Sequence, residues 1–127
     1  MEITPTALPE VLRVVPRRFG DARGWFMETF SEPKLEAAGH PLPRFVQDNQ
    51  SFSARKHTLR GLHYQAPPMA QAKLVRCTRG AIFDVAVDVR RGSPTFGQWV
   101  AERLSAEDGA QLYIPVGFLH GFVTLSD

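Results

Sequence analysis

The chain has 127 residues, which is enough for one domain built around one hydrophobic core. Hydrophobic residues make up 43% of it and charged residues 22%, as is usual for a globular protein. The net charge of +2 comes without a block or stripe of Lys and Arg, which argues against a nucleic-acid-binding protein. We therefore expect a single domain over residues 1–127.

The cysteine count and the hydropathy pattern bear on the cellular compartment. Cys77 is the only cysteine, so no disulfide can form within the chain, which fits a reducing compartment. Residues 1–9 include Glu2 and two prolines and have no apolar region of the kind found in a signal peptide. No apolar run reaches the length of a membrane span. The sequence predicts a cytoplasmic protein with no membrane association.

Short strands are the commonest element that we expect, because ten Gly and ten Pro are spread along the chain and favour turns over long helices. The first predicted strands are residues 11–15, which are apolar, and residues 24–30, which mix aromatic side chains with Glu28.

One helix is predicted, over residues 31–38. Ser31 can cap its first turn, and Pro33 stands early, where proline is tolerated. Gly39 can end the helix.

Residues 45–53 alternate along the chain and predict a strand. Phe45, Gln47 and Asn49 fall on one face, while Val46 and Asp48 fall on the other. The alternative interpretation of Gln47-Asp48-Asn49 is a turn or a strand edge.

The second half of the chain reads as strands separated by turn signals. The predicted strands are residues 73–78, 81–89, 96–104, 111–114 and 117–125. Many short strands at regular spacing indicate an all-β fold, either an antiparallel sandwich or a small barrel.

Two acidic residues share one face of the predicted strand at residues 81–89. Asp84, Ala86 and Asp88 lie on that face, and Phe83 and Val85 lie on the other. A face with two acids is either solvated, which is the more common case, or paired inside a cavity.

The densest group of chemically useful side chains comprises Arg60, His63 and Lys73. A neutral histidine is the usual proton acceptor near neutral pH, and an ammonium group stabilises an enolate oxygen. The arginine fork suits a diphosphate. The three together would suit proton abstraction beside a carbonyl on a phosphorylated ligand. Strict alternation places Arg60 and His63 on opposite faces of a strand, and a bulge at Gly61 would bring them to one face.

Each candidate also has an ordinary interpretation. Lys73 taken alone is typical of a solvated amine, and Arg23 and Arg60 are typical of exposed residues. His40 and His57 are expected at the surface. The chain has no His-x-His pair, so a metal centre is not favoured.

Seven segments taken together in order make a more specific pattern than any single residue. They are residues 19–28, 45–51, 59–65, 73–75, 84–88, 93–97 and 114–122. In this combination the chain resembles the dTDP-4-dehydrorhamnose 3,5-epimerase family, from about Leu12 to the last residue.

The resemblance implies a cupin-type jelly-roll barrel of antiparallel strands, a homodimer, and catalysis with no metal and no cofactor. It implies a dTDP-sugar substrate, dTDP-4-dehydro-6-deoxy-D-glucose, which is epimerised at C3 and C5 to dTDP-4-dehydro-L-rhamnose. By matching motifs, His63 would be the general base, Lys73 would stabilise the C4 enolate, and Asp84 would be a supporting acid. The residues that would hold the sugar nucleotide are Arg23, Glu28, Gln47, Asp48, Asn49, Arg60 and His120.

The resemblance also implies a departure at the end of the sequence. Members of the family continue past Leu125 with a tyrosine that reprotonates the opposite face of the sugar and an aspartate that pairs with the base. We therefore expect the C-terminal part of the family fold to be missing here. Two readings stay open: an epimerase, and a binding module that holds a sugar nucleotide without turnover. A metal-dependent cupin enzyme is a third reading.

Overall fold

The computed structural model describes residues 1–126, so Asp127, the last residue of the expected domain, lies outside it. Within this range the chain forms short strands and one short helix. The strands are β1 (Glu2–Pro5), β2 (Leu12–Val15), β3 (Arg18–Asp21), β4 (Gly24–Met27), β5 (Leu59–His63), β6 (Lys73–Arg76), β7 (Ala81–Asp88), β8 (Trp99–Ser105), β9 (Gln111–Ile114) and β10 (Phe118–Thr124), and the helix is α1 (Glu32–Ala37).

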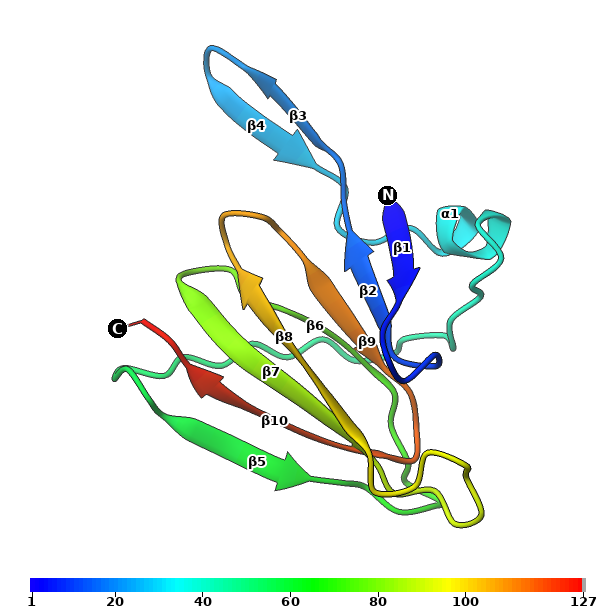
Figure 1. Ribbon diagram of the computed structural model, residues 1–127. Helices are drawn as coiled ribbons and strands as arrows, with labels where there is room; N and C mark the ends of the chain where they lie inside the picture. Colours follow the sequence, from blue (N-terminus) through cyan, green and yellow to red (C-terminus); the bar gives the residue numbers. More distant parts are fainter. Residues whose placement is uncertain (127) are drawn as a thin grey trace.

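Two four-stranded sheets and a hairpin make up the architecture. One sheet has the strand order β1-β2-β9-β6, the other has the order β5-β10-β7-β8, and β3 pairs with β4 alone. Every pairing is antiparallel. Figure 1 shows the two sheets facing each other, with the β3–β4 hairpin projecting away from them. The all-β antiparallel jelly-roll prediction is confirmed.

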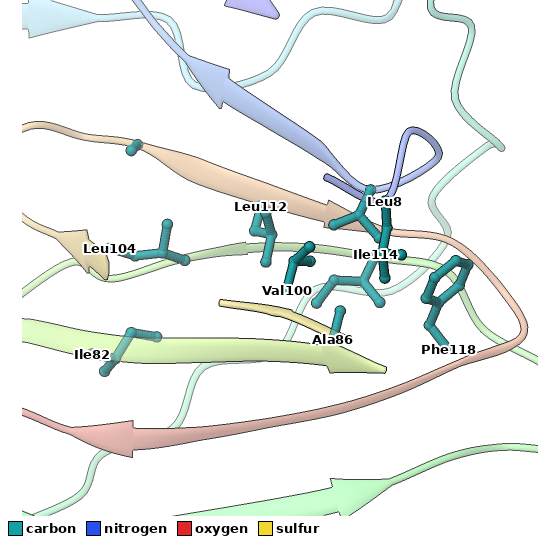
Figure 2. Close-up of a cluster of buried hydrophobic side chains, with 10 residues drawn as sticks. Leu8, Ile82, Ala86, Val100, Leu104, Leu112, Ile114 and Phe118 are labelled. Carbon is teal, nitrogen blue, oxygen red and sulfur yellow. The ribbon is translucent and has the colours of Figure 1, made fainter. Parts of the chain in front are cut away.

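The core lies between the two sheets (Figure 2). Leu112 and Ile114 of β9 face Ile82 and Ala86 of β7, and all four are at most 9% exposed. Val100, Leu104 and Phe118 complete the same cluster, together with Leu8 and Val11 from the turn before β2. Because each fully buried Leu, Ile or Val side chain stabilises the fold by about 1.5–3 kcal/mol, this layer is what holds the sheets together.

Helix α1 forms where its capping residues predict it. The Ser31 hydroxyl accepts a hydrogen bond from the backbone N–H of Lys34, and Pro33 stands in the first turn. Gly39 follows with a φ of +83°, a conformation that favours glycine and ends the helix. Leu35 is the residue that α1 buries.

The predicted strand at residues 45–53 is wrong. The structure gives this stretch no sheet partner, and most of its side chains are exposed. Alternation shows only that a segment can be extended, whereas a strand also needs a neighbouring edge to satisfy its backbone groups. The segment is held instead by Arg60, which donates to the Ser53 hydroxyl and to the Phe52 carbonyl.

The predicted strands in the second half all occur, with ends that differ by at most three residues. The strand predicted at residues 24–30 is shorter, because β4 ends at Met27. No helix in residues 1–126 is both long enough and apolar enough to cross a membrane.

Asp88 is fully buried, so the more common interpretation of this acid as a solvated residue is wrong. The Arg90 guanidinium and the hydroxyls of Ser93 and Thr95 all donate to its carboxylate. The hydrogen bonds from Arg90, joined by those from the two hydroxyls, lower the pKa of Asp88 far below its ordinary value. This cluster fixes the turn that connects β7 to β8.

Candidate active site

A bulge in β5 sets the direction of two predicted site residues. His120 of β10 is paired with His63, and Phe122 is paired with Arg60, so two residues of β5 oppose Gly121 alone. His120 and Phe122 share one face of β10, and therefore His63 and Arg60 share the corresponding face of β5. The bulge that the sequence predicted at Gly61 is confirmed.

Glycine is required on both sides of this bulge. Gly61 has a φ of +107°, and a Cβ placed on it would lie 2.7 Å from both Gly121 Cα and the His120 carbonyl oxygen. A Cβ on Gly121 would lie 2.8 Å from the Arg60 carbonyl oxygen. The close approach of these two backbones brings the rings of His63 and His120 to a centroid separation of 5.6 Å, edge to face.

His120 and Asp84 form a buried pair. The side chain of Asp84 is fully buried, His120 is 5% exposed, and the distance from His120 Nε2 to Asp84 Oδ1 is 2.7 Å. When the carboxylate is ionised, the imidazole N–H donates to it. Burial raises the pKa of Asp84, and the hydrogen bond from His120 opposes that effect. Asp84 is therefore buried and paired, and the more common interpretation of this acid as a solvated residue is wrong.

The other polar atoms of this pair are buried without a hydrogen-bond partner in the part of the chain that the structure describes. Among the described residues, neither Asp84 Oδ2 nor His120 Nδ1 has a hydrogen-bond partner, and both atoms are buried. Buried polar atoms without partners are rare, because each costs about 1–3 kcal/mol. A polar ligand in the space between the sheets would satisfy them.

Lys73 belongs to the sheet opposite the one that carries His63, His120 and Asp84. It is the first residue of β6 and is paired with Ile114 of β9. Burial lowers the pKa of Lys73, and the charge of Asp84 raises it in part. The pKa of His63 is also lowered, first by burial and then by the positive charges of Lys73 and His120. The structure thus brings together four of the predicted residues from two sheets.

This group has the chemical capacity of an enolising site. A lowered pKa keeps His63 neutral at pH 7, the form that accepts a proton. The half-buried Lys73 ammonium supplies positive charge for an oxygen that becomes negative. His120 is oriented by Asp84 in the way that carboxylates commonly fix an imidazole.

Arg60 contacts the end of the segment that includes Gln47, Asp48 and Asn49, the other residues expected to hold the nucleotide. Arg60 is tied to the end of this segment at Phe52 and Ser53. The Gln47 side-chain amide donates to Asn49 Oδ1 over 3.3 Å, and all three polar residues are exposed. The sequence assigned no role to Ser53, although this residue follows residues 45–51, one of the seven segments that carry the resemblance, by two positions.

Arg23 and Glu28 are not brought to His63. Arg23 lies at the turn of the β3–β4 hairpin and pairs with Asp21 at 2.6 Å, while Glu28 follows β4 and pairs with Lys34 at 2.8 Å. Figure 1 shows this hairpin at the far end of the molecule from β5. Within one copy of the chain, these two residues stand apart from the histidines.

Two further expectations concern histidine and metal. His57 is exposed, as expected, and His40 is half-buried. In residues 1–126 the structure groups no three His, Cys, Asp or Glu side chains in an arrangement that could hold a metal ion.

Comparisons with known proteins identify the family of this chain. The family profile described as dTDP-4-dehydrorhamnose 3,5-epimerase matches residues 5–127. The dTDP-4-dehydrorhamnose 3,5-epimerase of Pseudomonas aeruginosa is 60% identical over 128 residues, which cover 100% of this chain and 69% of that protein.

Solved structures of similar proteins carry relevant ligands. The dTDP-4-dehydrorhamnose 3,5-epimerase of Bacillus anthracis, with TDP and PPi bound, superposes with a TM-score of 0.94 at 47% identity, covering 98% of this chain and 71% of that one. The Legionella pneumophila dTDP-6-deoxy-D-glucose-3,5-epimerase, in complex with dTDP-4-keto-L-rhamnose, superposes with a TM-score of 0.90 at 49% identity, covering 98% and 65%. The chain belongs to the dTDP-4-dehydrorhamnose 3,5-epimerase family.

Proposed function

We propose that this protein epimerises dTDP-4-dehydro-6-deoxy-D-glucose at C3 and C5 to give dTDP-4-dehydro-L-rhamnose. The observation that carries the proposal is the group of His63, Lys73 and the His120–Asp84 pair, which places a neutral base, an ammonium and an oriented imidazole between the two sheets. The family of the chain and the ligands of the Legionella and Bacillus proteins support the same substrate class.

The chemistry needs no group beyond the side chains and the substrate. C3 and C5 both flank the C4 ketone, so removal of either proton moves the C–H electron pair into an enolate with its charge on the C4 oxygen. His63 takes the proton, and Lys73 stabilises that oxygen as its charge develops. Inversion follows when a proton that originates from water is delivered to the opposite face, where the enolate electron pair forms the new C–H bond and the C4 ketone is restored, and His63 then releases its proton to water. We propose that the reaction is independent of metals and cofactors.

His120 and Asp84 support this reaction from one side of the cavity. Asp84 fixes the His120 ring, and His120 Nδ1 has no hydrogen-bond partner within residues 1–126, so a bound sugar could supply one. We assign His120 to the sugar and Asp84 to holding His120, while Arg60 and the segment with Gln47, Asp48 and Asn49 hold the nucleotide.

The hairpin suggests how Arg23 and Glu28 would contribute. Its aromatic residues Phe19, Trp25 and Phe26 are 55%, 57% and 72% exposed. An arm of this kind is stabilised by burial against another surface. We propose a homodimer in which the hairpin of one copy packs on the other copy and carries Arg23 and Glu28 toward the second site.

Mixed dimers test this shared site. Proteins with Arg23→Ala or His63→Asn are each expected to be nearly inactive, and a mixture refolded together should recover part of the activity, because one site of each mixed dimer is intact. If both residues served the site of their own copy, the mixture would show only the sum of the two separate activities.

Binding without turnover is the second candidate function. Its support is that inversion needs a second proton carrier opposite His63. Tyr113 has a hydroxyl that could carry a proton, but it packs in a core cluster with Leu12 and Val14 instead.

We also propose that the domain comprises residues 1–127 and that the protein acts in the cytoplasm.

Deuterium uptake distinguishes the two functions. In heavy water with the keto sugar nucleotide, proton NMR should show exchange at C3 and C5. Binding visible by line broadening with no exchange at either carbon would favour the binding module and contradict an epimerase.

His63→Asn tests the identity of the base. The substitution keeps a polar side chain of similar size but removes the basic nitrogen, so exchange at both carbons should fall by about 100-fold or more while dTDP affinity stays within about twofold. Exchange at the original rate would remove His63 from the role.

A further inference from the structure

The guanidinium of Arg60 is held on one edge by two neutral oxygen atoms. Its Nε donates to the Ser53 hydroxyl over 3.0 Å, and its Nη2 donates to the Phe52 carbonyl over 2.9 Å. Ser53 is half-buried, and its neighbours Phe52 and Ala54 are exposed. The two bonds use two of the five guanidinium N–H groups, and within residues 1–126 the other three have no hydrogen-bond acceptor and can serve a ligand.

These contacts orient the charge of Arg60 without neutralising it. Within residues 1–126, Arg60 has no carboxylate partner, whereas Arg23 pairs with Asp21 and Arg90 pairs with Asp88 at 2.6 and 2.9 Å. An arginine bound by a carboxylate has its fork and much of its charge already engaged. Arg60 keeps its charge and the other edge of its guanidinium, and the bulge places it on the face of β5 that also presents His63.

Orientation before binding has a measurable benefit. A free arginine side chain loses rotamer entropy when a ligand immobilises it, and this loss weakens binding. An arginine already fixed along one edge avoids most of this cost and presents its remaining N–H groups in one geometry.

We propose that Ser53 is a positioning residue that holds Arg60 for the diphosphate of the sugar nucleotide. The inference rests on the proposed function, because it deepens the role given there to Arg60. Ser53 does not touch the reacting carbons, so it acts on nucleotide affinity and leaves the rate of proton transfer unchanged.

The test compares Ser53→Ala, Ser53→Thr and Arg60→Ala in the full-length protein. Calorimetric titration with dTDP should show a loss of affinity of about five- to tenfold for Ser53→Ala, because the charge-assisted bond is removed. KM for the keto sugar nucleotide should rise by a similar factor while kcat stays within about twofold. Ser53→Thr keeps the hydroxyl and should restore the original values.

A double-mutant cycle separates positioning from a general effect on the fold. Arg60→Ala should weaken dTDP binding by about 10–100-fold. In the Arg60→Ala protein, adding Ser53→Ala should change dTDP affinity by less than twofold, because the hydroxyl has no guanidinium left to hold. Equal effects of Ser53→Ala in both backgrounds would overturn the positioning role.

The outcomes also separate the inference from the function on which it rests. If the unsubstituted protein does not bind dTDP, both fail. If it binds dTDP and Arg60→Ala weakens the complex while Ser53→Ala does not, only the positioning role fails.

Discussion

The imidazole of His63 sets the acidic limit of the pH range in which the site can work. Burial and the charges of Lys73 and His120 lower its pKa from the ordinary 6.5. Sequence alone could name His63 as a base, but the lowering of its pKa comes first from burial and then from Lys73, which belongs to another sheet. The neutral form of His63 therefore persists to more acidic pH than an isolated histidine would allow.

The pH dependence of exchange follows from two groups. Activity needs neutral His63, so it should rise with pH along a limb centred below 6.5. It also needs protonated Lys73, whose pKa is lowered by burial, so it should fall along a limb centred below 10.5. The profile of kcat/KM against pH measures both limbs, and an acid limb centred above 6.5 would contradict the environment described for His63.

At the scale of the element, the bulge in β5 places Arg60 and His63 on one face, and the Asp88 cluster fixes the turn after β7. The bulge was predictable, because Arg60 and His63 could share a face only if Gly61 interrupted the alternation. The Asp88 cluster was not, because a buried carboxylate cannot be told from a solvated one without knowing what surrounds it.

Gly61→Ala should displace β5 from β10. The new Cβ would lie 2.7 Å from backbone atoms of His120 and Gly121, which cannot move cheaply. We expect a loss of about 2–4 kcal/mol in the free energy of unfolding, from strain and overpacking together, and a large loss of exchange activity.

The control for Gly61→Ala is Gly92→Ala, at a position that also has a positive φ but open space around it. Its cost should be the backbone strain alone, about 1–2 kcal/mol, with activity retained. Urea unfolding and the exchange assay measure both variants. Equal effects of the two substitutions would show that the close approach at the bulge is unimportant.

Asp88→Asn should destabilise the turn between β7 and β8. Removing the buried charge leaves Arg90 with only Glu10 as an acidic partner, at 3.3 Å, and should cost about 3 kcal/mol at pH 7. Because the folded-state pKa of Asp88 is depressed, its stabilisation is present above the unfolded pKa of about 4 and is lost as the pH falls below it.

Urea unfolding at several pH values measures this effect. The difference in the free energy of unfolding between the original protein and Asp88→Asn should narrow as the pH falls below about 4. Glu36→Gln, at an exposed position of α1, is the control and should change little at any pH. A difference that stayed constant with pH would argue that the charge of Asp88 is not what stabilises the turn.

At the scale of the whole molecule, one apolar layer holds the two sheets in the relation that the site needs. His63 and Asp84 belong to one sheet and Lys73 to the other, so their group exists only while the layer is intact. Stability and activity are therefore linked through core residues that touch no ligand.

Leu112→Ala tests how much this apolar layer contributes to the stability of the fold. Leu112 is 0% exposed on β9, next to the strand that begins with Lys73. The cavity should cost about 2–5 kcal/mol in the free energy of unfolding, whereas Val116→Ala, at a position that is 48% exposed, should cost under about 1 kcal/mol. Thermal unfolding measures both, and a cost for Leu112→Ala as small as that for Val116→Ala would remove it from the core.

The sequence by itself determined the features whose causes are local. Ser31, Pro33 and Gly39 bound the helix, apolar periodicity located β2 and the strands from β6 to β10, and Gly61 marked the bulge. Backbone propensity and side-chain alternation act over a few residues, so they can be read without knowing what lies opposite.

Only the tertiary structure decided which groups meet. The partner of His120 is Asp84, 36 residues earlier, and Lys73 arrives from the facing sheet. Residues 45–53 alternate like a strand but find no edge to pair with, and the hairpin takes Arg23 away from His63. These outcomes depend on strand register and sheet packing. Both arise from the summed burial of the whole core, so no short sequence pattern predicts them.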